Sequence, residues 1–222
     1  MFITSTHDYV LFFTNRGKMY RMKGYEIPET GRAARGSHVV NLLPIEKDEK
    51  ISAMIRVDEV ENDSYLVMVT RNGTIKRTAL SAYRNVRKGG IIAISLEEGD
   101  ELAWVRNTTG EDDLIIATRQ GVAIRFAESD VRPMGRTATG VRAIRLDEGD
   151  EVIAMATCEE GGYLLTVTEN GQGRRTALGE YRTQNRGGRG VRNYDCEGKG
   201  TLVAGVRVVG EEDDVILIAD DG

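Results

Sequence analysis

The stretch from Tyr65 to Leu80, which reads YLVMVTRNGTIKRTAL, decides the fold. Its first six residues are apolar, aromatic or β-branched, and they end at Arg71-Asn72-Gly73. Such a run is typical of a strand, and Asn-Gly is a common hairpin turn because glycine adopts a positive φ without steric cost. A second strand is expected to return directly after Gly73. The stretch therefore predicts an antiparallel β-hairpin.

This hairpin pattern recurs along the chain. Equivalent apolar runs occupy residues 9–14, 114–118 and 163–168, and a further run at 215–219 leads to Gly222 in the same way. The turn glycines are 56, 48 and 50 residues apart, and Gly222 lies 51 residues beyond the last of them. Each of the four hairpins has an arginine four residues after its turn glycine, in the pairs Gly17 and Arg21, Gly73 and Arg77, Gly121 and Arg125, and Gly171 and Arg175.

Each repeat continues through a loop to a second glycine, Gly36, Gly90, Gly140 or Gly190. A third strand is expected after that glycine, over Val39–Leu43, Ile91–Ile94, Val141–Ile144 and Val191–Tyr194. An acidic turn precedes a fourth strand, over Ile51–Val57, Leu102–Val105, Val152–Ala156 and Leu202–Val209. Four short antiparallel strands in each repeat, with little helical periodicity, predict an all-β propeller with four-stranded blades. A β-sandwich is the alternative, but sandwiches do not normally repeat their turn residues in register.

We expect a single domain over residues 1–222. The blades are expected at about 7–57, 63–106, 112–157 and 162–209. Phe2–Thr6 matches the closing strand of a blade and Val215–Ala219 matches an opening strand, so residues 1–6 and 213–222 are interpreted as parts of incomplete blades. The chain is accordingly interpreted as a fragment of a larger domain.

Composition restricts the other function classes. The chain has 222 residues, of which 40% are hydrophobic, without a run of about 18 apolar residues or a signal peptide. A cytoplasmic protein with no membrane partner is expected. Cys158, Cys196, His7 and His38 lack metal-ligand spacing, and Gly198-Lys199-Gly200 lacks the Ser or Thr of a P-loop. We therefore expect no metal, no cofactor and no catalytic site in this chain.

Charge is distributed unevenly along the repeats. The net charge is -5, yet the four windows between the turn glycine and the second glycine carry 18 basic and 5 acidic residues. Acidic residues collect in the turns before the fourth strands. Such segregation predicts a basic track on one rim, which is the electrostatic footprint of a protein that binds the phosphate backbone. The alternative is that the arginines protect strand edges and keep the blades soluble.

The richest loop is Gln184-Asn185-Arg186-Gly187-Gly188-Arg189-Gly190. Its glycines allow the backbone to approach a phosphate closely, and guanidinium groups supply charge and paired hydrogen bonds. Base reading is not expected, because no recognition helix or zinc finger is visible. The candidate DNA-binding residues are Arg21, Arg32, Arg35, Lys76, Arg77, Arg84, Arg87, Lys88, Arg125, Arg132, Arg136, Arg174, Arg175, Arg182, Arg186, Gly187, Gly188 and Arg189.

These features resemble the C-terminal domain of the A subunit of bacterial DNA gyrase and its relative in topoisomerase IV. The resemblance rests on the repeat register, on Asn41-Leu42-Leu43-Pro44, on Thr139–Arg142 with Leu146–Asp150, and on Gln184–Gly190. The last segment is similar to the glutamine, basic and glycine box of that family, although Asn185 replaces a basic residue. It also lies in the fourth repeat, whereas the family places its box in the first blade.

The resemblance implies a β-pinwheel, a propeller variant with exchanged strands, whose basic perimeter bends and wraps duplex DNA. In gyrase this wrap supports ATP-dependent negative supercoiling. The implied partners are double-stranded DNA, the remainder of the gyrase A subunit, plus the gyrase B subunit, with ATP and magnesium bound elsewhere in the holoenzyme. The alternatives are the topoisomerase IV domain, which helps to select the DNA segment, and a propeller that binds protein.

Overall fold

The four expected hairpins are present. The structure is a computed structural model that describes residues 3–58, 63–159 and 161–218. Each hairpin is antiparallel, and its turn glycine has a positive φ. The paired strands are β1 (Tyr9–Thr14) with β2 (Lys18–Lys23), β4 (Tyr65–Thr70) with β5 (Thr74–Ala79), β8 (Asp113–Thr118) with β9 (Val122–Ala127), and β12 (Tyr163–Thr168) with β13 (Gly173–Ala177).

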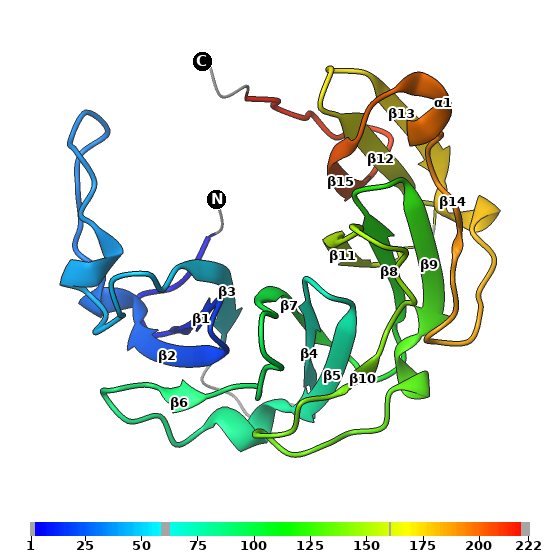
Figure 1. Ribbon diagram of the computed structural model, residues 1–222. Coiled ribbons are helices and arrows are strands. Elements are labelled where there is room, and N and C mark those ends of the chain that lie inside the picture. The colour runs from blue at the N-terminus through cyan, green and yellow to red at the C-terminus, as the bar shows by residue number, and fades with distance from the viewer. Residues whose placement is uncertain (1–2, 59–62, 160, 219–222) are drawn as a thin grey trace.

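The strand that was expected as the fourth of each repeat pairs with the first strand of the hairpin. These strands are β3 (Ile51–Val57), β7 (Leu102–Thr108), β11 (Val152–Thr157) and β15 (Val203–Val209). Successive members of this set contact one another along the concave side of the open arc in Figure 1. They therefore form the inner edge of the blades, and the second strands of the hairpins lie farther out.

The outermost strand of a sheet comes from the following repeat. The sheet orders are β3-β1-β2-β6, β7-β4-β5-β10 and β11-β8-β9-β14, in which the last strands are β6 (Ile91–Ile92), β10 (Val141–Arg142) and β14 (Val191–Arg192). The exchange is fixed by the turn glycines, because the carbonyl groups of Gly17, Gly73 and Gly121 accept the amides of Ala93, Ala143 and Asn193, each at 2.7 Å. Consecutive repeats are therefore interlocked. The remaining sheet, β13-β12-β15, has three strands.

The hydrophobic core lies between blades as well as within them. One cluster joins Val67, Val69 and Ile75 of the second hairpin to Leu114 and Ile116 of the third. Helical segments are short: η1 (Gly24–Glu26), η2 (Val39–Asn41), η3 (Leu80–Tyr83), η4 (Glu128–Asp130), η5 (Leu178–Glu180) and α1 (Cys196–Lys199). Within the described residues, no helix is long and apolar enough to cross a membrane.

Three expected strands are not formed. Val39–Asn41 is a 3-10 turn, although it is the counterpart of β6, β10 and β14 in the first repeat. Those strands pair with the hairpin of the preceding repeat, and the described residues contain no hairpin before the first one. Residues 3–6 and 214–218 are not in strands either, and Phe2, Ala219 and Gly222 lie outside the described residues. The expectation that both ends belong to further blades stays a prediction.

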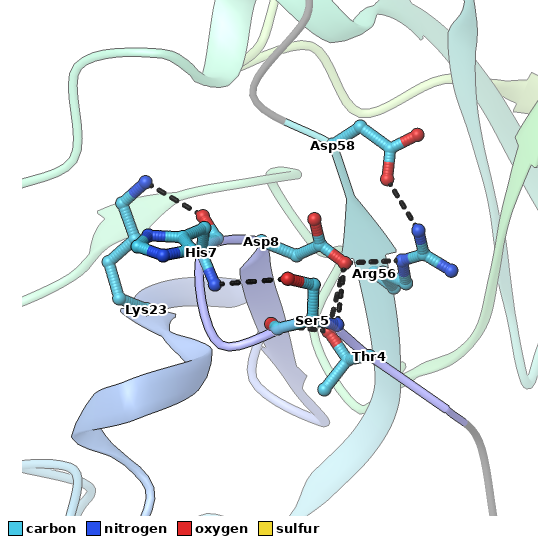
Figure 2. Close-up of polar contacts among 7 residues, drawn as sticks. All are labelled: Thr4, Ser5, His7, Asp8, Lys23, Arg56 and Asp58. Carbon is cyan, nitrogen blue, oxygen red and sulfur yellow. Dashed lines mark hydrogen bonds and ion pairs between the residues drawn. The ribbon is translucent and has the colours of Figure 1, made fainter.

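The segment before β1 is held by Asp8 (Figure 2). The Asp8 carboxylate accepts the Ser5 amide at 2.8 Å and the Arg56 Nε of β3 at 2.7 Å. The hydrogen bond from Ser5, assisted by Arg56, lowers the pKa of Asp8 below its usual value. Residues 4–8 therefore form a turn that is attached to the first blade.

Gly140 precedes β10 and is a position where the pairing of this exchanged strand with β5 depends on glycine. Its φ is +110°, and a Cβ would lie 2.4 Å from the Ile75 carbonyl oxygen on β5. We expect Gly140→Ala to lower the free energy of unfolding by about 2 kcal/mol, through backbone strain and displacement of β10. Gly135→Ala is the control, since nothing lies within 4 Å of the added Cβ and the φ there is not positive. Urea unfolding of both variants measures the difference, and equal stabilities would contradict the prediction.

Candidate nucleic-acid interface

The loops that were predicted to bind DNA lie outside the hairpins. Residues 84–90, 132–140 and 182–190 lead directly into the outermost strands β6, β10 and β14, at the convex side of the arc in Figure 1. The loop at residues 28–38 extends away from the first blade. The structure places ten of the predicted residues at exposed positions: Arg32, Arg35, Arg84, Arg87, Lys88, Arg132, Arg174, Arg175, Arg182 and Arg189.

In the first three hairpins, the arginine four residues after the turn glycine has a structural role that the sequence did not reveal. Its guanidinium group reaches the next repeat and donates to a carbonyl at or beside the end of the 3-10 turn there. Arg21 donates to Arg84 at 2.6 Å, Arg77 to Val131 at 2.7 Å and Arg125 to Leu178 at 3.0 Å. These arginines join neighbouring blades, which explains their fixed register.

Arg77 and Lys76, two of the predicted DNA-binding residues, are buried in this structure. Both side chains lie in the interior, with residue exposures of 7% and 0%. Arg77 stacks on Tyr65 with 4.6 Å between the guanidinium carbon and the ring centroid, and it also donates to the Gly110 carbonyl. The following repeat covers both residues, so neither belongs to the exposed surface of this structure.

Arg77 shares its interior site with a buried carboxylate. Glu128 is 0% exposed and lies 3.9 Å from an Arg77 nitrogen. Its oxygens accept the Thr108 hydroxyl at 2.7 Å and the amides of Gly110 and Asp112 at 2.8 and 2.9 Å. A buried charge needs such partners. The second and third repeats are therefore connected by a buried ionic network.

Four candidates are only partly exposed: Arg21, Arg125, Arg136 and Arg186. Arg125 forms an ion pair with Asp113 at 2.8 Å. Arg136 donates to the Ile92 carbonyl, and Arg186 donates to the carbonyls of Arg142 and Asp130. Their hydrogen bonds to the backbone hold the loops in place, so these guanidinium groups are less available to a ligand than those of the exposed set.

The glycines of the Gln184–Gly190 loop contact the preceding exchanged strand. The Gly187 amide donates to Ala143 at 2.7 Å, and the Gly188 carbonyl accepts the Arg145 amide at 2.8 Å. Gly187 has a φ of +83°. These bonds fasten the loop to the residues after β10. The two glycines thus shape the loop, with Arg189 exposed on it and Arg182 exposed just before it.

Three exposed arginines of the outer edge were absent from the predicted set. Arg142 lies on β10, Arg145 follows it, and Arg192 lies on β14, all at the outer edge. A signal was present in the sequence, since Arg142 and Arg192 each stand two residues after a second glycine. We call the exposed set the basic rim, composed of Arg32, Arg35, Arg84, Arg87, Lys88, Arg132, Arg142, Arg145, Arg174, Arg175, Arg182, Arg189 and Arg192.

Two arginines near the inner edge, Arg71 and Arg119, are neutralised, in contrast to much of the rim. Arg106 of β7 and Arg207 of β15 differ from them, because they are close enough to repel each other. Arg71 lies between Glu101 and Glu151, at 2.9 and 3.5 Å, and Arg119 lies between Glu151 and Glu169, at 3.6 and 2.5 Å. On the rim, Arg189 approaches Asp147 at 3.4 Å and Arg192 approaches Asp195 at 3.8 Å, with all four side chains well exposed. Solvent screens such exposed pairs. A positive potential is therefore expected on the convex side.

A family model described as the DNA gyrase C-terminal domain, beta-propeller, matches residues 8–58, 64–109, 112–159 and 162–209. The chain belongs to this family. The prediction of an all-β propeller with antiparallel blades is confirmed, and so is the resemblance stated from the sequence. The exchanged strands β6, β10 and β14 agree with the β-pinwheel variant.

Curated relatives of the gyrase domain family are similar over most of the repeats. The DNA gyrase A subunit of Clostridium acetobutylicum is 57% identical over 141 residues, which cover 64% of this chain and 17% of that protein. The DNA gyrase A subunit of Staphylococcus aureus (strain NCTC 8325 / PS 47) is 52% identical over 138 residues, covering 62% of this chain and 16% of that protein. The aligned region is thus less than a fifth of the length of these relatives.

Solved structures of the gyrase domain family have the same architecture. The C-terminal domain of DNA topoisomerase IV superposes with a TM-score of 0.85 at 30% identity, over 93% of this chain and 65% of that one. The DNA gyrase A C-terminal domain superposes with a TM-score of 0.77 at 28% identity, over 95% and 68%. Structure alone does not separate the two branches, whereas the curated relatives named above are gyrase subunits.

Proposed function

We propose that this chain binds duplex DNA along the basic rim and bends the duplex around its convex side. The carrying observation is the placement of exposed basic residues on successive outer loops and strands, while Arg71 and Arg119 near the inner edge are paired with carboxylates. A convex track of guanidinium groups suits a phosphate backbone that curves. Bending costs several kcal/mol, which the additional phosphate contacts offset.

We propose that this activity serves a type II DNA topoisomerase, which the membership of the gyrase domain family supports. We propose that the chain serves the gyrase A subunit in the cytoplasm, together with the rest of that polypeptide and the gyrase B subunit, and that its wrap supports ATP-dependent negative supercoiling. The identity of 52–57% to gyrase A subunits supports gyrase over topoisomerase IV. DNA cleavage, ATP and magnesium are assigned to other parts of the assembly.

Duplex length provides the test of wrapping. We expect a duplex of about 150 bp to bind at least 10-fold more tightly than one of about 20 bp, because only the longer one reaches the rim of several blades as it bends. Fluorescence anisotropy with labelled duplexes measures both affinities. Sealing a nicked circle in the presence of the chain should also shift its linking number. If the two duplexes bind with equal affinity per site and the linking number does not shift, wrapping is excluded and only electrostatic binding remains.

A protein-binding propeller is the second candidate. It predicts weak DNA binding at physiological salt and a flat dependence of affinity on salt concentration. Titration of the long duplex between about 0.05 and 0.2 M salt distinguishes the two functions, because phosphate contacts impose a log-log slope of about -0.9 each.

A further inference from the structure

We propose that Lys76 is a positioning residue for DNA binding, whose amino group fixes the basic loop of the third repeat, residues 132–140, to the second repeat. The inference rests on the proposed function for its consequence, and on the contacts of Lys76 for its geometry. Lys76 lies on β5, and its side chain points into the contact between repeats with 0% exposure.

The amino group of Lys76 contacts three backbone carbonyls. Nζ donates to Ala93, which follows β6, and to Arg136 and Gly135 of the basic loop, with 3.5 Å to the Gly135 oxygen. The three carbonyl oxygens match the three N–H donors of the ammonium form, and the neutral amine still has two. Lys76 thereby joins two segments that belong to different repeats.

The basic loop bears the rim residue Arg132 before this attachment and the partly exposed Arg136 at it. Arg132 is exposed, and Arg136 extends back to the Ile92 carbonyl on β6. The Met134 amide donates to the Arg77 carbonyl at 2.9 Å, and the Ala138 amide donates to the Gly135 carbonyl at 3.1 Å. Ser95 also fastens this loop, because its hydroxyl donates to the Thr137 carbonyl at 2.6 Å and its amide donates to the Ala138 carbonyl at 3.3 Å. Loss of the Lys76 contacts would therefore loosen the loop at residues 135 and 136 while these other contacts remain. We infer that Arg132 and Arg136 would then sample a wider range of positions.

Equivalent positions in the other repeats do not make this contact. The residue three after the turn glycine is Tyr20, Lys76, Ile124 or Arg174. Tyr20 donates its hydroxyl to the Pro44 carbonyl at 3.3 Å, Ile124 is apolar and buried, and Arg174 is exposed on β13. The sheet can therefore be built around an apolar residue here, so folding alone does not require a lysine.

The surroundings of Lys76 disfavour its charge. Burial, with a smaller effect of the Arg136 guanidinium, lowers the pKa of Lys76 to about 7. The other titratable group beside it is Tyr83, whose ring centroid lies 6.0 Å away and whose pKa burial raises to about 12. The equivalent position in the third repeat is apolar, so a buried amino group here is not needed for the stability of the sheet. Its attachment of the loop is the simpler explanation for the lysine.

Lys76→Met tests the inference with the fold preserved. Methionine has a similar length to lysine. The Ala93 carbonyl still accepts a hydrogen bond from the Tyr83 hydroxyl at 2.9 Å, and the loop carbonyls can accept hydrogen bonds from water. For a duplex of about 150 bp at 0.1 M salt, we expect Lys76→Met to weaken binding about 5-fold and to reduce the log-log salt slope by about 1 to 2 through disordered Arg132 and Arg136. Tyr83→Phe is the matched control. It removes a hydrogen bond to the same Ala93 carbonyl without touching the loop, and it should bind DNA as the wild type does.

A double-mutant cycle separates positioning from general destabilisation. In a background carrying Arg132→Ala and Arg136→Ala, Lys76→Met should cause no further loss of affinity. An equal 5-fold loss in that background, or wild-type affinity of Lys76→Met itself, would overturn the inference while the proposed function stands.

Hydrogen exchange reports on the loop without DNA. The amide of Ala138 should exchange about 10-fold faster in Lys76→Met, and that of Met68 in the centre of β4 should not change. Unchanged exchange at Ala138 would overturn the attachment itself. If the wild-type chain does not bind DNA, the proposed function fails and the positioning role fails with it, whereas faster exchange would still support the attachment.

Discussion

Arg77→Met is expected to lower the free energy of unfolding by about 3–5 kcal/mol, because it leaves the buried carboxylate of Glu128 without its cation. The Glu128 side chain is 0% exposed, so water does not replace the lost partner in the folded state. The carbonyl of Val131, which accepts Arg77 Nε at 2.7 Å, also loses its donor. Urea unfolding followed by far-UV circular dichroism measures the loss.

Arg175→Met provides the matched control. Arg175 occupies the same register in the fourth hairpin and stacks on Tyr163 at 4.4 Å, as Arg77 stacks on Tyr65. It is nevertheless exposed, so its replacement should change stability by less than about 0.5 kcal/mol. A loss below about 1 kcal/mol for Arg77→Met, or equal losses for both variants, would show that the buried network is not what joins the second and third repeats.

Removal of Arg182, Arg189 and Arg192 together is expected to weaken binding of long duplex DNA on the order of 100-fold near 0.1 M salt. All three are exposed near the outer edge of the third sheet, on β14 or the loop before it. If each contacts one phosphate, the log-log slope of affinity against salt should fall by about 2.7. Anisotropy titrations at several salt concentrations measure both quantities, and stability should change little.

The control for this triple variant removes the same charge away from the rim. Lys47, Lys50 and Lys199 are exposed in and beside the acidic turns that precede the inner strands. Their replacement by alanine should weaken DNA binding less than about 5-fold, because only the long-range potential changes. Comparable losses in the two variants would mean that net charge, and not the basic rim, determines affinity.

The hairpins could be predicted from the sequence because their information is local. An apolar run, a turn glycine and a returning strand are adjacent in the chain, and β4 and β5 formed where Tyr65–Leu80 indicated. The exchanged strands could be located but not assigned to a sheet. Nothing in Ile91–Ile92 specifies that it pairs with β2 and not with its own hairpin. That choice depends on contacts between repeats.

The basic rim could be predicted from the sequence as a charge pattern, but the exposure of individual arginines could not. Arg77 and Arg175 share the sequence Arg-Thr-Ala-Leu, yet one is buried and the other is exposed. The difference comes from the following repeat, which covers Arg77 and supplies Glu128. Arg142, Arg145 and Arg192 were missed for a related reason, since their exposure depends on the outer position of β10 and β14.

Because strands are exchanged between repeats, the described part of the chain cannot be shortened between repeats without removing a strand from a neighbouring sheet. A chain that stopped at residue 161 would keep β9 but lose β14, which pairs with it. A chain that stopped after β14 would keep β12 and β13 but lose β15. Each truncation exposes a strand edge that invites aggregation. Repeats can thus be added or deleted only where a neighbouring sheet finds a substitute strand, which makes trimmed versions of this chain poor reporters of what any single repeat does.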